Sequence, residues 1–218
     1  MKKQILIVGS GFSGMWAAVS AARLSALEGN NSLSISVLAP VAELRVRPRF
    51  YEENVSTMVA PLTELFAELG ITFIAGEAQR IDTSSKTVLY RDSNGVIAEV
   101  VWERLILATG SQTKRPPVAG LAEYAFDIDQ LDSARLFEQH LDSLVSRPST
   151  PERNTVVVCG GGFTGIELAT ELPARLRTRF GTHTKTKIIV VERGATIGGR
   201  YSEALRNTIE EASSALGV

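Results

Sequence analysis

The amino-acid sequence predicts an α/β fold that contains the same supersecondary unit twice. A short apolar run, a glycine-rich turn and a helix-forming segment follow one another over residues 2–24 and again over 155–172. The first glycines of the two turns are 151 residues apart (160 − 9), which is too distant for a solenoid repeat. Between them, residues 71–109 have the alternation and turn residues of consecutive β-strands.

The composition is that of a globular protein. Hydrophobic residues make up 44% and charged residues 22% of the 218 positions. The 23 basic and 24 acidic residues give a net charge of −1, so nothing favours nucleic acid or an anionic membrane surface as a partner. The single cysteine, Cys159, excludes an internal disulfide, a CxxC zinc site and an active-site dithiol. His140 and His183 have no metal-ligand pattern around them, so no metal site is expected.

The first 22 residues have the general layout of a secretory signal, with lysines, an apolar run and small residues. A strand, a glycine turn and a helix explain them better, because three glycines would weaken a signal helix by about 1 kcal/mol each. No stretch reaches the roughly 18 apolar residues that a transmembrane helix needs. We therefore expect a cytoplasmic location and no transmembrane segment.

The first half of the chain is expected to begin with a strand over 2–8 and a helix over 15–24, followed by a strand over 34–40. Residues 41–57 look irregular, and residues 59–69 resemble an amphipathic helix with Pro61 in its first turn.

Three strand runs follow, over 71–82, 86–92 and 96–110, and Asn94-Gly95 predicts a hairpin between the last two. The third run starts with alternation and ends in an apolar string, 105–108, that we expect to be buried.

The second half begins with a turn-rich segment over 111–128. A helix is expected over 129–146, with an apolar face made of Leu131, Leu136, Leu141, Leu144 and Val145. The polar segment 147–154 is the best internal boundary. After it we expect a strand over 155–159, a helix over 166–172, a strand over 187–194, and a helix over 202–216 that Gly217 closes. This gives three parts: 1–115, a connecting segment over 116–154, and 155–218.

Each glycine of the GxGxxG turns has its own physical purpose. Gly9 allows the tight turn that leaves the strand, Gly11 lets a pyrophosphate approach the backbone, and Gly14 lets the helix pack against the strand. The free N–H groups at the helix start then favour phosphate. Gly160 to Gly165 repeat the pattern in the same strand–helix context, which such a motif requires. The sequence thus predicts two Rossmann-like dinucleotide-binding units with parallel sheets, the first carrying an antiparallel β-meander insertion and the second incomplete.

The two copies differ where an acidic residue would hold the adenine ribose. In the second copy Glu192 ends the next strand, and a carboxylate there favours NADH over NADPH because it would repel a 2′-phosphate. Arg193 beside it favours NADPH instead, because an arginine at this place can accommodate the 2′-phosphate. Glu192 lies 32 residues past Gly160 (192 − 160), more than the usual spacing of about 20, so a solvated residue at a strand end stays an alternative. The first copy has Ala39 at the equivalent position.

Five segments together resemble the flavoproteins that have two dinucleotide-binding domains: VGSGFSG at 8–14, GEAQRID at 76–82, LILATGS at 105–111, PPVAG at 116–120 and VVVCGGGFTGIELATEL at 156–172. The resemblance covers essentially the whole chain. The lack of a redox cysteine pair excludes the disulfide reductases, and GGFTGIELATEL is most similar to type II NADH dehydrogenases. Members of that branch continue through a second flavin-side motif and a C-terminal domain, so this chain looks C-terminally incomplete.

The resemblance implies FAD in the first unit and NADH in the second. The FAD residues would be Gly9, Ser10, Gly11, Phe12, Ser13, Gly14, Ala39, Pro40, Arg47, Ala78, Ala108, Thr109 and Gly110. The NADH residues would be Gly160, Gly161, Gly162, Phe163, Thr164, Gly165 and Glu192. Glu167 would lie beside the nicotinamide–flavin contact, as the catalytic position. The alternatives are a surface charge for Arg47, a buried strand end for Thr109, and a solvated helix residue for Glu167.

The resemblance therefore implies an FAD-dependent oxidoreductase that takes a hydride from NADH and passes electrons to a quinone-like small acceptor. The alternatives are a truncated or regulatory nucleotide-binding module without turnover, and an NADPH-dependent flavin monooxygenase. A homodimer is possible under this reading, and contact with a membrane surface would depend on a C-terminal part beyond this sequence.

Overall fold

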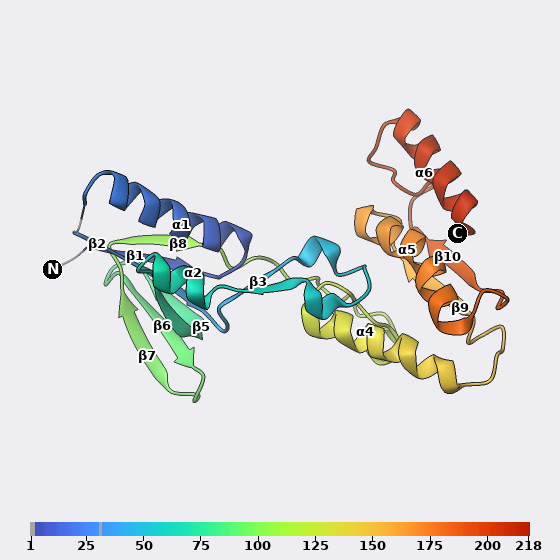
Figure 1. Ribbon diagram of the computed structural model, residues 1–218, viewed down its shortest axis with the longest axis horizontal. Helices are drawn as coiled ribbons and strands as arrows, with labels where there is room; N and C mark the ends of the chain where they lie inside the picture. Colours follow the sequence, from blue (N-terminus) through green and yellow to red (C-terminus); the bar gives the residue numbers. More distant parts are fainter. Residues whose placement is uncertain (1–2, 31) are drawn as a thin grey trace. The chain divides into compact units, whose positions relative to one another are not determined.

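The computed structural model describes residues 3–30 and 32–218, which form two compact units (Figure 1). Unit 1 contains the chain up to Arg45 together with Val59–Thr113. Unit 2 contains Val46–Met58 and Lys114–Val218. The 46–58 segment therefore belongs with the second half of the chain, and the predicted connecting segment is part of unit 2. This division differs from the three consecutive parts that the sequence suggests.

Unit 1 is built on a six-stranded sheet with the strand order β7-β6-β5-β2-β1-β8. Its parallel part contains β1 (Lys3–Val8), β2 (Leu33–Ala39), β5 (Thr72–Asp82) and β8 (Arg104–Leu107). Its antiparallel part continues β5 into β6 (Thr87–Asp92) and β7 (Ile97–Val101), so the α/β class and the β-meander are confirmed.

Two helices accompany this sheet, α1 (Phe12–Leu27) and α2 (Thr63–Glu68). The buried residues of α1, Met15 and Ala18, share a core with Ile7 of β1, Val37 of β2 and Phe66 of α2. This packing fixes the start of α1 at the carboxyl end of β1.

Two predictions for unit 1 are wrong. The helix expected over 59–69 begins only at Thr63, and β4 (Val59–Pro61) pairs antiparallel with β3 (Glu43–Arg45) instead. Proline disfavours the helical conformation of the residue before it, which keeps Ala60 extended. The end of the apolar string is not buried either, because Ile106 is 38% and Leu107 59% exposed on β8, which lies at one edge of the described sheet.

Unit 2 contains a parallel pair of strands, β9 (Thr155–Cys159) and β10 (Lys187–Val191). Its helices are α3 (Leu121–Tyr124), α4 (Leu131–Ser143), α5 (Phe163–Phe180) and α6 (Glu203–Leu216). Three short 3₁₀ turns are η1 (Arg47–Arg49), η2 (Val55–Thr57) and η3 (Leu144–Ser146). None of the helices in the described residues is long and apolar enough to span a bilayer.

The core of unit 2 joins α4 and α5 to the strand pair through Phe137, Leu141, Leu172, Leu176 and Val158. The apolar face predicted over 129–146 differs from the structure, because Leu136 of α4 and Val145 of η3 are exposed while Ala134 and Phe137 are buried.

Helix α5 extends eight residues beyond the predicted end at 172, through Pro173 inside the helix. Proline is usually a helix breaker, but here Pro173 is buried in the packed part of α5.

Candidate functional site

The first glycine loop, residues 9–14, leaves β1 with a backbone that requires glycine. Gly9 has φ of +111°, and its N–H donates to the carbonyl of Leu38 at 2.8 Å. A Cβ atom at Gly9 would lie 2.1 Å from the Ala108 carbonyl oxygen, and one at Gly14 would lie 1.9 Å from the Gly9 oxygen. Both positions therefore exclude any side chain.

A cleft of about 310 Å³ lies over this loop. It is lined by Leu107 and by six residues that the sequence assigned to FAD: Gly11, Phe12, Ser13, Ala108, Thr109 and Gly110. A Cβ at Gly11 would meet no atom within 4 Å, so the backbone is open here. Within the described residues no side chain caps the start of α1. The cleft therefore has the open backbone and free helix-start N–H groups that a pyrophosphate needs.

The other residues predicted for the first site are not among those that line this cleft. The Ser10 hydroxyl donates to the carbonyls of Val41 (3.0 Å) and Glu43 (3.2 Å), and Ala39 is buried at the end of β2. Pro40 follows it and is exposed, while Ala78 lies at a bulge in β5. Arg47 belongs to unit 2, where it forms an ion pair with Asp129.

The second glycine loop, residues 160–165, repeats the geometry of the first. Gly160 has φ of +122°, and its N–H donates to the carbonyl of Val191 at 2.8 Å. A Cβ at Gly165 would lie 1.8 Å from the Gly160 oxygen. Gly162 is open, the adjoining Phe163 and Thr164 are exposed, and in the described chain no side chain caps the start of α5. Unit 2 thus has a second open glycine backbone at an uncapped helix start, a geometry that favours anions.

Glu192, at the end of β10, holds the second loop. Its two carboxylate oxygens accept hydrogen bonds from Gly161 N (2.7 Å) and Gly194 N (2.8 Å). These bonds, with that from Gly194 the stronger influence, lower the pKa of Glu192, so the carboxylate is ionised at neutral pH. An ionised carboxylate at this position has lone pairs left for a hydroxyl group.

Sequence reasoning missed the segment that closes over this loop. Gly198 N–H donates to the Gly161 carbonyl at 2.8 Å, and a Cβ at Gly161 would lie 2.9 Å from Cγ2 of Ile197. The available signal was the glycine cluster ERGATIGG directly after the strand, a pattern typical of a loop.

Glu167 lies on α5 and is half-buried. Burial, and then the negative charge of Glu52, raise the pKa of its carboxyl above the ordinary value. The pKa of Tyr51 is also raised, by burial and by the charge of Glu167, so these residues lie close together within unit 2. Tyr51 and Glu52 were not predicted to belong to the site, because the 46–58 segment looks like an ordinary irregular loop.

No group of three or more histidine, cysteine, aspartate or glutamate side chains in residues 3–30 and 32–218 could hold a metal ion. Unit 1 therefore offers one candidate site, the first glycine loop with its cleft, and unit 2 offers another, the second glycine loop with Glu192 and Glu167.

Two strand–glycine loop–helix units in one chain define the class of two-domain dinucleotide-binding proteins. The model of the pyridine nucleotide-disulphide oxidoreductase family matches residues 3–218, and the chain belongs to this family. An NADH dehydrogenase-like protein of Mycobacterium tuberculosis is 35% identical over 221 residues, which cover 99% of this chain and 54% of the relative. A demethylphylloquinone reductase of Synechocystis is 30% identical over 100% of this chain and 53% of its own length.

A solved structure, NDH2 of Plasmodium falciparum in complex with NADH, superimposes with a TM-score of 0.84. It is 17% identical, with 100% of this chain and 47% of that chain covered, so it supports the fold alone. The chain spans about half the length of the curated relatives it matches.

Proposed function

We propose that the chain is the nucleotide-binding part of an FAD-dependent oxidoreductase that takes a hydride from NADH and delivers electrons to a quinone-like acceptor. The observation that carries the proposal is the pair of glycine loops. They have the same backbone geometry, but only the second has a carboxylate, Glu192, bonded to its loop. A chain with two such loops is suited to two different dinucleotides.

FAD fits the first site. Gly11, Phe12 and Ser13 would hold the pyrophosphate at the open start of α1, and Thr109 and Gly110 would border the cofactor from the other side of the cleft. The buried Ala39 leaves room for an adenosine near the end of β2 but supplies no ribose acceptor. We keep Arg47 as a proposed ribose or phosphate contact, although it pairs with Asp129 in this structure.

NADH fits the second site, with its pyrophosphate over Gly160–Gly165. Glu192 would accept from the ribose hydroxyl groups through its remaining lone pairs, and its charge would repel a 2′-phosphate. We therefore propose NADH in preference to NADPH.

When bound, the two cofactors supply the hydride donor and the hydride acceptor, and the protein aligns them. Glu167 would lie beside the nicotinamide. Burial, and after it the negative charge of Glu52, raise the pKa of this carboxyl above the ordinary value for glutamate.

The names of the relatives, among them a demethylphylloquinone reductase and type II NADH:quinone oxidoreductases, support a quinone-like acceptor. A cytoplasmic location, contact with a membrane surface through residues outside this sequence, and a homodimer are further parts of the proposal.

The test uses the complete gene product. Purified protein should show the absorbance of bound flavin, and anaerobic NADH should bleach it faster than NADPH does. Addition of a short-chain quinone should restore the colour. A flavin-loaded protein that NADH leaves oxidised would contradict the proposal, and faster reduction by NADPH with a hydroxylated product would favour a monooxygenase.

A further inference from the structure

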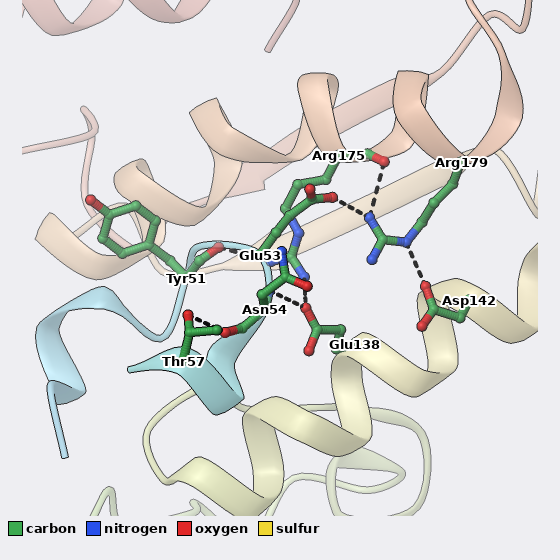
Figure 2. Close-up of polar contacts among 8 residues, drawn as sticks. All are labelled: Tyr51, Glu53, Asn54, Thr57, Glu138, Asp142, Arg175 and Arg179. Carbon is green, nitrogen blue, oxygen red and sulfur yellow. Dashed lines mark hydrogen bonds and ion pairs between the residues drawn. The ribbon is translucent and has the colours of Figure 1, made fainter. Parts of the chain in front are cut away.

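The 46–58 segment packs against α4 and α5 in unit 2 through two arginines of α5 (Figure 2). Nη1 of Arg175 donates to the carbonyl of Tyr51 at 2.8 Å. Arg179 pairs with Glu53 and also donates from Nε to Asp142 at 2.8 Å. The side chains of Arg175 and Arg179 are 1% and 13% exposed. The turn formed by Tyr51, Glu52 and Glu53 is therefore held by buried or nearly buried cations.

A second contact reaches the same segment from α4. The Glu138 carboxylate accepts from the backbone N–H of Asn54 at 2.6 Å, and its oxygen lies 3.9 Å from Nη2 of Arg175. Nε and Nη2 of Arg175 have no hydrogen-bond partner among the described residues. The Arg175 guanidinium also lies 5.5 Å from the ring centre of Phe137.

The burial of Arg175 is expensive. A guanidinium that leaves water with part of its donors unpaired loses hydration free energy that one good hydrogen bond does not fully return. Buried ionic groups of this kind can fix one conformation among several, at a cost in stability. Here the hydrogen bond from Arg175 to the Tyr51 carbonyl fixes the position of the Tyr51 backbone.

The position of Tyr51 matters because of the spacing along α5. Glu167, Glu171, Arg175 and Arg179 are four residues apart in turn, so they follow one another on one side of the helix. The turn lies along this row. Its Glu53 and Tyr51 carbonyl meet the two arginines, while Tyr51 and Glu52 interact electrostatically with Glu167.

We propose that Arg175 and Arg179 are positioning residues, which anchor the Tyr51–Glu53 turn so that Tyr51 and Glu52 stay against Glu167. The arginines do not touch the reacting groups. They act through the turn, whose Tyr51 and Glu52 interact electrostatically with Glu167. The value of this for catalysis rests on the proposed function of Glu167, but the anchoring itself does not.

The test starts from the carboxyl of Glu167 in the complete protein, titrated by ¹³C NMR and assigned with Glu167→Gln. Glu52 interacts electrostatically with Glu167, and Tyr51 interacts electrostatically with Glu167, Glu52, Glu171 and Arg49. Arg175→Met and Arg179→Gln should release the turn, and the pKa of Glu167 should then fall towards the ordinary value for glutamate, because water gains access and Glu52 moves away. Arg175→Lys, which can still donate to the Tyr51 carbonyl, should preserve the raised value.

Two further variants keep the test decisive. Glu53→Gln breaks the same anchor from the turn side and should also lower the pKa of Glu167, which covers the case that the α5 variants fail to fold. Arg177→Gln changes an exposed arginine of the same helix that is outside the row, and it should change nothing.

The rate of anaerobic flavin reduction by NADH gives a second readout. Arg179→Gln should slow it about tenfold, because misplacement of a side chain near reacting groups costs factors of this order. In a Glu167→Gln background the same change should have little further effect, since the arginine acts through Glu167. Equal and additive losses in both backgrounds would overturn the proposal, and so would a pKa of Glu167 that is unchanged in folded Arg175→Met and Arg179→Gln. If the pKa falls as expected but wild-type protein is not reduced by NADH, the anchoring stands and the proposed function fails.

Discussion

The two glycine loops have nearly the same backbone and different surroundings. In both, the first glycine has a positive φ and donates to the end of the neighbouring strand at 2.8 Å, and the last glycine touches the carbonyl of the first. In unit 1 the loop is covered on one side by Ala108, whereas a Cβ at Gly160 in unit 2 would meet nothing within 4 Å. In the first loop the residue after the first glycine is Ser10, whose hydroxyl donates a hydrogen bond to the Val41 carbonyl beyond β2. In the second loop this residue is Gly161, whose N–H donates a hydrogen bond to Glu192.

This comparison separates what a dinucleotide loop requires from what makes it selective. The strand, the three glycines and the helix start are common to both copies, so we propose that they supply the phosphate site. The residues after the second strand differ, and they determine which group can be held beside the phosphate.

The largest expected effect comes from closing the space inside each loop. In Gly14→Ala the new Cβ would collide with the Gly9 carbonyl, and we expect a loss of about 3 kcal/mol in unfolding free energy and of bound flavin. Gly165→Ala should damage NADH binding in the same way and leave flavin bound. Flavin absorbance and NADH titration measure both effects.

The control for this pair is Gly11→Ala and Gly162→Ala, whose added methyl groups point into open space. These variants should keep the fold, as judged by thermal unfolding. Normal flavin content in Gly14→Ala would contradict a close-packed loop.

The second prediction concerns Glu192. Glu192→Gln keeps the shape but removes the charge, and it should weaken NADH binding about tenfold, as expected for the loss of charge-assisted hydrogen bonds. It should also reduce the preference for NADH over NADPH. Isothermal titration with both nucleotides measures this, with Glu210→Gln, an exposed carboxylate on α6, as the matched control. An unchanged preference would mean that Glu192 only closes the loop.

A third experiment exchanges the residue after the first glycine between the loops. Ser10→Gly removes the donor to two carbonyls and should lower the unfolding free energy by about 1 kcal/mol, with flavin retained. The reciprocal Gly161→Ser would place Cβ 2.9 Å from Ile197 and 3.1 Å from Glu192, so it should weaken NADH binding. Denaturant titration and nucleotide titration distinguish the two. If both variants behave alike, the two loops are equivalent at this position.

The smallest effect is a contrast in pH dependence between two carboxylates of unit 2. The pKa of Glu192 is lowered, so its contribution to stability is present above the ordinary glutamate range and is lost as the pH falls through the lower folded value. The pKa of Glu167 is raised, so its charged form opposes folding above that value, and the opposition disappears as the pH falls. Glu167→Gln should therefore raise the unfolding temperature slightly at pH 8, and Glu192→Gln should lower it. If the unfolding temperature at pH 8 instead falls in Glu167→Gln and rises in Glu192→Gln, the pKa shifts assigned to the two carboxylates have the wrong sign.

Local physics explains which parts the sequence predicts well. A glycine loop between a strand and a helix depends on a few neighbouring residues, so both loops, the Asn94-Gly95 hairpin and the cap at Gly217 follow from the sequence. Ala108, Thr109 and Gly110 of the cleft were predicted through the resemblance of LILATGS to the flavoprotein family, and Leu107 was not predicted. Glu192 was found in spite of its long spacing, because it ends a strand.

Contacts between residues far apart in the sequence explain the parts of the structure that the sequence does not predict. The 46–58 segment is held by partners 124 and 126 residues further along the chain, Arg175 and Arg179, and no periodicity within the segment indicates this. Pro61 suggested the first turn of a helix but ends a short strand, and Pro173 lies inside a helix that was predicted to end at residue 172. In both cases packing with other segments decided the outcome.

The position of the 46–58 segment has a consequence for anyone who recombines this protein with a relative. A single crossover at residue 113 would combine helix α5 of one parent with the Tyr51–Glu53 turn of the other, even though residue 113 is the last residue of unit 1. A chimera should inherit residues 46–58 and 114–218 from the same parent. The residues of unit 2 are therefore encoded in two separate parts of the gene. A chimera that takes the whole of unit 2 from one parent needs three crossover points, after residues 45, 58 and 113.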